Sequence, residues 1–329
     1  MRARLLVLAA CVASALAVAG AALGSDGGFS PAGPDSPNAD RIQTTYWFVF
    51  GFAAAVFLLV EIALAVFIVR YRSRGRPREV EGPQVRGHLK LEIVWTAVPI
   101  LILATIAAFV FSQLSGIDTT PNAGAAGSRL HVGVQGRQFY WQFTYPNGVI
   151  EINRLRVPVG RPVRLEVTSP DVNHSWWIPA LGGKIDAIPG HPNHTWFELS
   201  KPSTYTARCA EFCGIQHAVM KATVEGVPAP QFDSWLADQA RAQTDGTSDL
   251  GKQEFEGVCA VCHGPQGQGG IGPNLAGSAI ARDHNALATL LENGGKLMPA
   301  VGRGWTQRQE QALFSYLDQH VTKPAASGG

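Results

Sequence analysis

The sequence predicts a multidomain protein in which a two-helix transmembrane hairpin precedes an all-β sandwich and a small all-α domain. Three observations support this prediction. Two long apolar runs, 46–69 and 93–114, lie in the first part of the 329-residue chain. Segments rich in β-branched and aromatic residues, separated by Gly, Pro and Asn, follow over 129–226. Helical patterns then occupy 249–322, and the total length suits two or three compact units.

The N-terminal 24 residues have the pattern of a secretory signal peptide. Two early arginines precede an apolar run of Leu, Ala and Val that ends in small residues. A lipoprotein signal is the alternative, because Cys11 ends a Leu-Ala-Ala-Cys segment of lipobox form. Residues 25–45 are predicted to be an exported linker, and residues 25–40 within it are rich in Gly, Pro, Ser and Asp.

The hairpin, residues 46–114, is predicted from the length of its two apolar runs. Tyr46–Val69 carries a single charged residue, Glu61, and at about 1.5 Å per residue it can span a ~30 Å hydrocarbon layer. Ile93–Leu114 contains Pro99, which membrane helices tolerate where neighbours satisfy the freed carbonyl. The arginine-rich segment between the runs predicts a cytoplasmic loop, with both termini outside. Two buried helices of a soluble domain are the weaker interpretation at this length.

Composition excludes some functions, and the cysteines indicate another. A net charge of +2 with 16% charged residues, and no basic stripe, argues against a nucleic-acid-binding protein. Apart from Cys11, the cysteines form two close pairs, and a histidine and then a methionine follow each pair. The members of these two clusters are Cys209, Cys213, His217 and Met220, and then Cys259, Cys262, His263 and Met298.

The first cluster, residues 209–220, reads C-A-E-F-C-G-I-Q-H-A-V-M. Thiolate, imidazole and thioether together suit copper, and a methionine is a weak axial ligand that tunes the reduction potential. Two thiolates four residues apart can bridge two metal ions, and the second ion then needs another imidazole. His174, in the earlier segment S-P-D-V-N-H-S-W-W, is the candidate. A structural Cys209–Cys213 disulfide is the alternative, but it leaves the histidine and the methionine of the cluster unexplained.

The pattern C-x-E-x-C-x-x-x-H-x-x-M, preceded by D-V-x-H-S-W, resembles the CuA site of cytochrome c oxidase subunit II. The resemblance covers roughly residues 41–226 and implies a cupredoxin-like sandwich with a dinuclear copper centre. In this family the main-chain carbonyl of Glu211 is also a copper ligand, and its side chain reaches a magnesium or manganese ion shared with subunit I. The implied side-chain ligands of copper are His174, Cys209, Cys213, His217 and Met220.

The resemblance extends to the second apolar run and to a loop beside the copper site. The segment H-L-K-L-E-I-V-W matches the start of the family's second helix, where Glu92 corresponds to an acid at the mouth of a proton channel in subunit I. An interfacial carboxylate near the lipid headgroups is the alternative for Glu92. Lys184 and Asp186, in L-G-G-K-I-D-A-I-P-G, also match the family. Glu61 is an intramembrane acid, hence a functional candidate, with packing against subunit I as the alternative.

Three positions depart from the family pattern. The family has the motif G-x-Q-W-Y-W, and its first tryptophan takes electrons from soluble cytochrome c. This sequence reads G-R-Q-F-Y-W, so that Phe139 replaces the first tryptophan. In the family, this position and the two that follow, here Tyr140 and Trp141, form the expected electron path. Thr144 stands where an acidic docking residue is common, and His191 replaces a usual arginine. The first two differences argue against docking of a free, basic cytochrome c and suit a tethered donor.

The second cluster, Cys259-Ala260-Val261-Cys262-His263, is the C-x-x-C-H sequence of covalent haem attachment. The two thiols add to the haem vinyl groups, and His263 becomes an axial ligand. A thioether as the sixth ligand raises the potential, and Met298 is the only methionine downstream. Gly272-Pro273-Asn274-Leu275 resembles the segment of class I cytochromes c whose proline carbonyl orients the ligating histidine. A redox C-x-x-C motif or a zinc knuckle is the alternative, but both lack their further partners here.

Residues 227–248, between the two redox domains, are predicted to be a polar linker with one short helical patch. Within 249–322, Thr306 and Gln309 predict a capping box at the start of the last helix. This helix is predicted to bury the apolar side chains that follow the capping box.

Together the resemblances imply the subunit through which electrons enter a haem–copper terminal oxidase. Electrons from a cytochrome c or a cytochrome bc complex would pass through haem c and CuA to subunit I, for reduction of oxygen to water with proton translocation. Subunit III is a further expected partner, in a bacterial cell membrane with both redox domains on the outer face. The alternatives are the equivalent subunit of a CuA-containing nitric oxide reductase and a stand-alone membrane electron carrier. Glu92 and Glu211 favour the oxidase.

Overall fold

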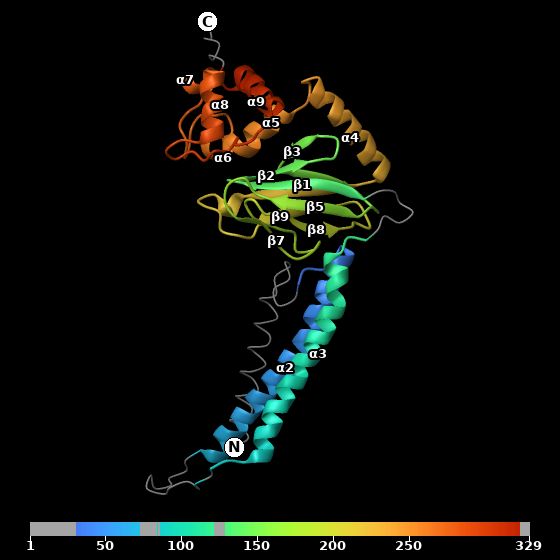
Figure 1. Cartoon of the computed structure of the whole chain (residues 1–329). Coiled ribbons are helices and arrows are strands. Elements are labelled where there is room, and N and C mark those ends of the chain that lie inside the picture. The colour runs from blue at the N-terminus through green and yellow to red at the C-terminus, as the bar shows by residue number, and fades with distance from the viewer. Residues whose placement is uncertain (1–30, 73–83, 85, 122–128, 323–329) are drawn as a thin grey trace, which may run out of the picture. The chain divides into compact units, whose positions relative to one another are not determined.

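A computed structural model describes residues 31–72, 84, 86–121 and 129–322 of the chain (Figure 1). The chain divides into two compact units, Asp40–Ile117 and the remainder. The predicted signal peptide lies outside the described residues, as does most of the arginine-rich loop.

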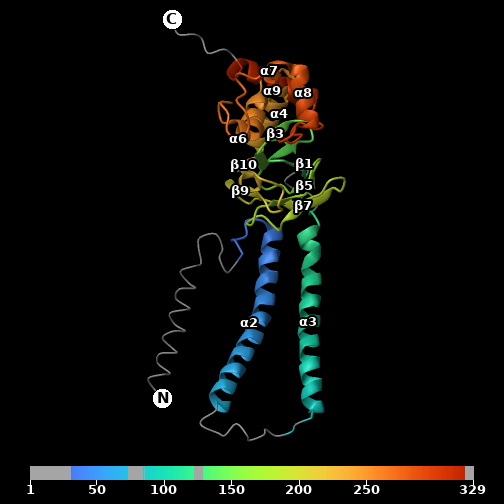
Figure 2. The same cartoon turned by 90° about the vertical axis from the view of Figure 1, so that its left-hand side faces the viewer.

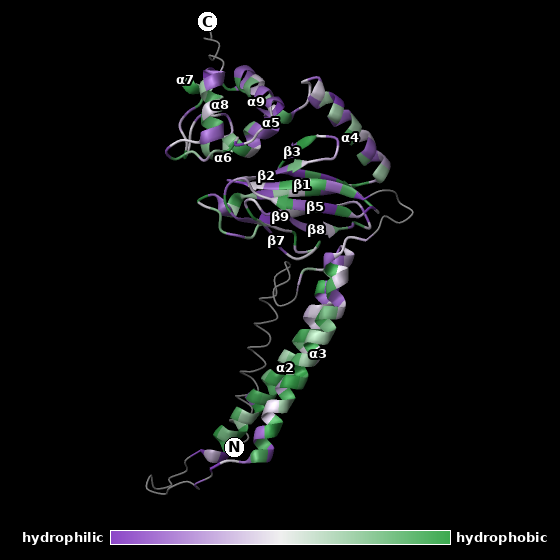
Figure 3. Cartoon of the chain, in the orientation of Figure 1, coloured by the Kyte–Doolittle hydropathy of each residue, from purple (hydrophilic) through white to green (hydrophobic). Residues whose placement is uncertain are grey.

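The first unit is a pair of antiparallel helices, α2 (Pro37–Tyr71) and α3 (Leu89–Asp118) (Figure 2). Both extend beyond the apolar runs that predicted them, because polar turns continue the helix at the ends. Hydrophobic residues predominate along the middle of both helices (Figure 3), and the most apolar stretch of each has no buried residue. Such an exposed apolar surface, on helices long enough to cross a bilayer, is stable in lipid rather than in water.

Within this unit the two helices contact each other near the end of α3. The rings of Phe48 and Phe109 stack with their centroids 3.9 Å apart. Earlier in α2, Nη1 of Arg41 donates to Oε1 of Gln113 at 3.1 Å. Pro99 lies inside α3. These contacts make the two spans a hairpin, as the sequence predicts.

The second unit contains a sandwich of two five-stranded sheets, with strand orders β3-β2-β1-β5-β8 and β4-β10-β9-β6-β7. The pairs β1–β5 and β4–β10 are parallel, and the other neighbours are antiparallel. The strands are β1 (Leu130–Arg137), β2 (Tyr140–Thr144), β3 (Ile150–Ile152), β4 (Arg154–Pro158), β5 (Val163–Thr168), β6 (His174–Trp177), β7 (Ile185–Ala187), β8 (Asn193–Phe197), β9 (Ser203–Cys209) and β10 (Lys221–Val227).

The core of the sandwich follows from side-chain alternation along the strands. In β1, Leu130, Val132 and Val134 are buried, whereas His131 between them is exposed. This period of two sends every second side chain to the space between the sheets. There the fully buried indole of Trp141 packs against the indole of Trp176 with ring centroids 5.0 Å apart. The predicted all-β fold is confirmed.

Residues 227–248 contain more structure than the short helical patch expected there. Helix α4 (Ala229–Thr244) has 16 residues, and Phe232 on it is fully buried in the core of the sandwich. Its neighbours Trp235 and Leu236 pack against the same core. Spacings of three and four residues put these apolar side chains on one helical face. Most of this segment is therefore a helix attached to the sandwich rather than a free linker.

The C-terminal domain is helical, as predicted. Its last helix has the expected capping box, in which the Thr306 hydroxyl accepts from the Gln309 amide and the Gln309 side chain accepts from the Thr306 amide. Its elements are α5 (Leu250–Glu254), the π-helical turn η2 (Phe255–Cys259), α6 (Ala260–His263), α7 (Ala279–Arg282), α8 (His284–Asn293) and α9 (Gln307–His320).

The helical domain and the sandwich share a second hydrophobic core. Tyr140, Ile150 and Ile152 of the sandwich are buried among apolar side chains of the helices, including Leu250 and Phe255. Hydrogen bonds cross the same boundary; for example, Nε2 of Gln309 donates to Oε1 of Gln142 at 3.1 Å. Since burial of apolar surface is the main attraction between packed elements, this shared core attaches the helical domain to β2 and β3.

Candidate copper and haem centres

The candidate copper ligands come from the ends of two neighbouring strands and from the loop that follows. His174 begins β6 and Cys209 ends β9, and these strands pair with Trp176 opposite Cys209. The loop after β9 then returns Cys213 to the same place. The ligand atoms of His174, Cys209 and Cys213 all lie within 4.8 Å of one another. Strand register therefore brings together residues from two separate parts of the sequence.

Sulfur and nitrogen atoms of five side chains form a continuous cluster around Cys213. Its Sγ lies 3.8 Å from Sγ of Cys209, 3.7 Å from Nδ1 of His217 and 3.8 Å from Sδ of Met220. On the other side, Sγ of Cys209 lies 3.8 Å from Nδ1 of His174. Both cysteines are free thiols and are buried. The disulfide alternative therefore does not describe this structure.

The predicted main-chain ligand belongs to the same cluster. The carbonyl oxygen of Glu211 lies 3.2 Å from Sγ of Cys209. The side chain of Glu211 is exposed on the loop. Two thiols, two imidazoles, a thioether and a carbonyl form the donor set that a dinuclear copper centre needs. The residues present thus fit the implied metal.

An aspartate that the sequence reasoning missed orients the first imidazole. Nε2 of His174 lies 2.8 Å from Oδ1 of Asp171, so Nδ1 is the ring nitrogen that faces the sulfurs. Asp171 is itself held by amides of Gln138 and Val172, at 2.8 and 2.6 Å. A carboxylate behind a ligating histidine fixes its tautomer and ring orientation. The available signal was the acid three residues before His174.

The electrostatics of the copper cluster favour a thiolate. A hydrogen bond with Cys213, opposed by burial and helped by His174, lowers the pKa of Cys209 well below its ordinary value. The same contact and burial raise the pKa of Cys213 above its ordinary value. Burial disfavours the charged form of His174, but the hydrogen bonds with Asp171 and Cys209 outweigh burial and raise its pKa. A thiolate for the first metal bond is thus available at neutral pH.

The haem-attachment residues lie on consecutive turns of η2 and α6. Cys259 and Cys262 are free and half-buried, and Nδ1 of the buried His263 donates to the carbonyl of Pro273 at 2.7 Å. This bond leaves Nε2 of His263 available for iron. A Cβ on Gly272 would lie 2.7 Å from Nδ1 of His263, so only glycine permits the approach. The Gly-Pro segment therefore has the geometry that its resemblance implies.

The thiols of the haem site differ electrostatically from those of the copper site. Burial, together with the charges of Glu254 and Cys262, raises the pKa of Cys259 to about 12. Burial also raises the pKa of Cys262. Both residues therefore remain thiols, the form that adds to vinyl groups. Met298 is half-buried in a loop, and it packs against the same apolar core as Cys259.

The residues predicted for the electron path and for the proton channel lie in different parts of the structure. The ring of Trp141 lies 6.1 Å from the ring of His174, centroid to centroid. Phe139 packs against the copper loop, since a Cβ on Gly214 would lie 3.0 Å from its ring. Tyr140 points instead to the helical domain. In the hairpin unit, Oε1 of Glu92 accepts from the His88 amide at 3.1 Å, a capping contact at the start of α3.

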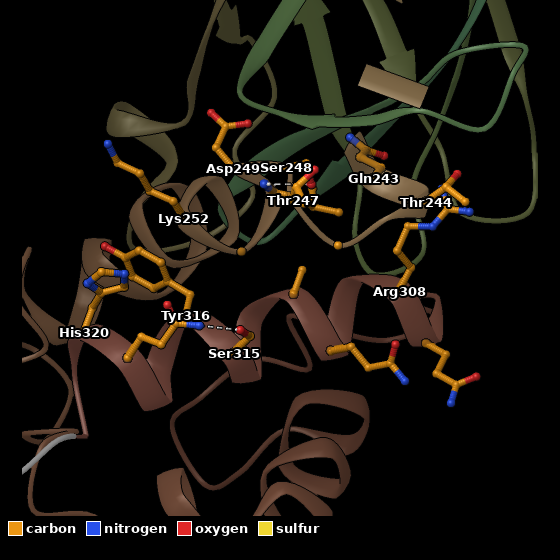
Figure 4. A pocket seen from close by; sticks show the side chains of 17 residues that line it. Gln243, Thr244, Thr247, Ser248, Asp249, Lys252, Arg308, Ser315, Tyr316 and His320 are labelled. Carbon is orange, nitrogen blue, oxygen red and sulfur yellow. Dashed lines mark hydrogen bonds between the residues drawn. The ribbon is translucent and has the colours of Figure 1, made fainter. Parts of the chain in front are cut away.

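A polar surface pocket of about 720 Å³ lies between the α4–α5 connection and α9 (Figure 4). Asp249, Lys252, Tyr316 and His320 are among the side chains that line it. It contains none of the predicted copper or haem ligands. The redox sites of this chain are therefore separate from this pocket.

Three families match successive parts of the chain: Cytochrome C oxidase subunit II, transmembrane domain, over 26–113; Cytochrome C oxidase subunit II, periplasmic domain, over 148–227; and Cytochrome C oxidase, cbb3-type, subunit III, over 246–317. Cytochrome c oxidase subunit 2 of Alkalihalophilus pseudofirmus is 32% identical over 300 residues, which are 82% of this chain and 86% of that protein. The chain belongs to the cytochrome c oxidase subunit II family.

One further relative and one solved structure are similar to parts of the chain. Cytochrome c oxidase subunit 2 of Synechocystis sp. is 32% identical over 252 residues, or 64% of this chain and 76% of that protein. A solved structure of the periplasmic domain of subunit II of cytochrome oxidase from Bradyrhizobium japonicum is 32% identical, covers 37% of this chain and 98% of its own, and has a TM-score of 0.35. This subunit II therefore carries a C-terminal cytochrome c domain in addition to the two subunit II domains.

Proposed function

We propose that this subunit takes up electrons at its C-terminal cytochrome c domain and delivers them through a dinuclear copper centre to subunit I of a haem–copper oxidase. The observation that carries the proposal is the convergence of the copper ligands in a domain that shares a buried core with the C-x-x-C-H domain. When bound, the covalent haem c and the copper pair supply one-electron redox chemistry without bond making or breaking. The chain itself supplies the ligands, their orientation and the exclusion of water.

The residues of this chain hold and tune the two groups. Cys259 and Cys262 would attach the haem, with His263 and Met298 as its axial ligands. His174, Cys209, Cys213, His217, Met220 and the Glu211 carbonyl would hold the copper pair. The buried position of Met220, which is 1% exposed, would keep its thioether away from water. This division of ligands makes the two centres separate modules.

We further propose that the haem domain is the first acceptor of electrons. Phe139 replaces the tryptophan that the family uses for a free cytochrome c, and here its ring packs on the copper loop. A donor tethered in the same polypeptide removes the need for that docking surface. The upstream donor would then be a cytochrome c or a cytochrome bc complex that meets the haem domain.

The partners of the subunit would be subunit I and subunit III in a bacterial cell membrane. The hairpin anchors the chain, with both redox domains on the outer face. Glu211, exposed beside the copper ligands, would share a magnesium or manganese ion with subunit I. Glu92 would lie at the mouth of a proton channel in subunit I, in addition to accepting the capping hydrogen bond from the His88 amide.

Purification of the full chain from membranes tests this function against its alternatives. The expected result is a complex with a catalytic subunit that consumes oxygen. Mass spectrometry should show one covalent haem on this chain, and near-infrared absorption should show the mixed-valence copper pair. Consumption of nitric oxide instead of oxygen would indicate the reductase. A chain isolated alone, without oxygen uptake, would overturn the proposal in favour of a stand-alone carrier.

A further inference from the structure

Glu254, in α5 of the helical domain (Figure 1), is an acid buried where that domain packs on the sandwich. It is 0% exposed, and neither oxygen of its carboxyl group has a hydrogen-bond partner among the described residues. The adjacent Phe255 is buried in the core that also contains Tyr140 and Ile152 of the sandwich. An ionised carboxylate without a partner is very costly in such surroundings, so the group becomes neutral instead. We therefore expect Glu254 to hold a proton.

The polar groups around Glu254 do not compensate a negative charge there. The side chain of Gln309 on α9 acts on the carboxyl group, but its Nε2 already donates to Oε1 of Gln142 at 3.1 Å. Lys252, on the same helix as Glu254, pairs with the exposed Glu256 at 3.8 Å. Burial raises the pKa of Glu254 well above its ordinary 4.5, and the Gln309 side chain only opposes this effect.

The charge of Glu254 acts on the place where the haem would be attached. Glu254 is five residues before Cys259, and burial together with the charge of Glu254 raises the pKa of Cys259 to about 12. On the side of the sandwich, burial raises the pKa of Tyr140 in β2, Arg137 of β1 opposes this, and Glu254 adds to it. Charges in a buried region are weakly screened. A change of charge at the haem should therefore act back on Glu254.

We propose that Glu254 is a proton-binding site coupled to the haem, which takes up a proton when the helical domain accepts an electron and releases it when the electron leaves. The inference rests on the proposed function. On reduction, the upstream cytochrome supplies one electron to the ferric haem, and the solvent supplies one proton to the carboxylate of Glu254. On transfer of the electron to the copper pair, the haem becomes ferric again and the carboxyl group loses its proton. The net charge of the buried region is then the same in both states.

The direction of this coupling follows from electrostatics. An added electron disfavours a nearby carboxylate and favours its protonated form, whereas oxidation favours the carboxylate. Because such linkage is reciprocal, protonation of Glu254 must favour reduction of the haem by the same factor. The haem potential should therefore fall as pH rises through the range in which Glu254 titrates. The upper bound is a tenfold change in the redox equilibrium per pH unit, which is about 59 mV for one electron.

The experiment compares Glu254→Gln with a matched control, Glu256→Gln, in the full-length oxidase complex. Glutamine keeps the size of glutamic acid and resembles its neutral form, but it does not titrate. Glu256 is only two residues from Glu254 and is closer to Cys259 in the sequence. Its side chain is 58% exposed and pairs with Lys252. The two variants therefore lose the same group near the haem-attachment segment, and only one of these groups is buried.

Redox titration at the haem absorption bands, repeated over a series of pH values, measures the coupling. In the wild type and in Glu256→Gln the haem potential should fall with rising pH, by up to about 59 mV per unit. Glu254→Gln should lose this dependence. A change that only disturbed packing would shift the potential equally at every pH. The wild-type dependence on pH in Glu254→Gln would overturn the proposal.

Infrared difference spectroscopy between the reduced and oxidised complexes observes the proton itself. The carbonyl band of a protonated carboxyl group should disappear on oxidation in the wild type and in Glu256→Gln, and it should be missing from the difference spectrum of Glu254→Gln. If Glu254→Gln does not accumulate, the wild-type spectrum still decides. A wild-type complex without such a band would overturn the proposal.

Failure of this inference and failure of the proposed function give different results. Flash-induced electron injection, with mass spectrometry of the chain, tests the function alone. A chain without covalent haem, or a haem that passes no electron to copper, would overturn the proposed function, whatever the pH titrations show. A haem that reduces copper, but whose potential does not depend on pH, would overturn only the role of Glu254.

Discussion

The copper cluster and the haem-attachment segment organise their ligands in different ways. The proposed copper ligands come from His174 and from residues 209–220, and the pairing of β6 with β9 joins these two parts of the sequence. The proposed haem-attachment residues lie within one short stretch, 259–263, and of the proposed haem ligands only Met298 comes from elsewhere. A covalently attached cofactor needs a local motif, whereas a metal held by coordination alone needs a scaffold formed before it binds.

The two pairs of thiols show the same contrast electrostatically. In the copper cluster the neighbouring Cys213 lowers the pKa of Cys209 well below its ordinary value. In the haem domain burial raises the pKa of Cys259 to about 12. One site therefore stabilises a thiolate for a metal, and the other keeps a thiol for addition to a vinyl group. The difference lies in the neighbouring groups, since all four residues are cysteines.

The sharpest test of this separation removes one cysteine from each site. Cys213→Ala should abolish the near-infrared copper absorption, because Cys213 contacts every other side-chain ligand except His174, and the covalent haem should remain. Cys262→Ala should reverse this pattern. Mass spectrometry and near-infrared spectroscopy of both proteins measure the result. Loss of both cofactors in either variant would contradict the modular comparison.

A second test addresses the expected axial methionine. Met298→Ala should lower the haem potential by on the order of 0.1 V, part of the roughly 0.8 V span over which axial ligands set haem potentials. Redox titration at the haem absorption bands measures the change, with copper content as the internal control. The Leu297→Ala variant is matched, because Leu297 is the neighbouring residue and is 92% exposed, and it should keep the wild-type potential. An unchanged potential in Met298→Ala would exclude this residue as the ligand.

A third test examines the group behind the copper ligand. Asp171→Asn should weaken copper binding about 10- to 100-fold, because the carboxylate that orients His174 is lost. Competition with a copper chelator measures the affinity. Asp233→Asn removes a carboxylate that pairs with Arg161 at 2.5 Å and should leave copper binding unchanged. Equal affinity in the two variants would show that Asp171 does not position the imidazole.

The smallest expected effect is a pH dependence of the free energy of unfolding, caused by a buried carboxyl group where the two domains pack together. Burial, with the charge of Asp249, raises the pKa of Glu151 from its ordinary 4.5 to about 7. The folded chain therefore keeps a proton that the unfolded chain has lost, and the free energy of unfolding falls as pH rises from about 4.5 to 7. The full change is at most about 3 kcal/mol.

Thermal unfolding of the detergent-solubilised chain across this pH range measures the Glu151 effect. Glu151→Gln should flatten the dependence of the unfolding midpoint on pH. The control is Glu225→Gln, at a partly exposed carboxylate that pairs with Arg156 at 2.9 Å, and it should keep the wild-type slope. If Glu151→Gln retained the full slope, the titrating group would lie elsewhere.

The sequence by itself determined the kinds of element and the kinds of chemistry. Apolar runs long enough to cross a bilayer, side-chain alternation in the strands and the C-x-x-C-H motif are local patterns. The preference of thiolate, imidazole and thioether for copper belongs to the side chains themselves. For these reasons the hairpin, the sandwich, the helical domain and the clustered residues of each candidate site could be predicted from local patterns, whereas the full copper ligand set, with the Glu211 carbonyl, was implied by the resemblance to subunit II.

Only the tertiary structure decided which distant residues meet. Periodicity shows that Tyr140 and Trp141 face opposite sides of a sheet, but it does not show what lies on either side. The contacts of Tyr140 with Val301 and Trp305 join residues 161 and 165 positions apart. Likewise, α4 is packed on the sandwich by Phe232 where the sequence predicted a polar linker. Local pattern fixes the direction of a side chain, whereas its partner depends on how separately folded domains dock.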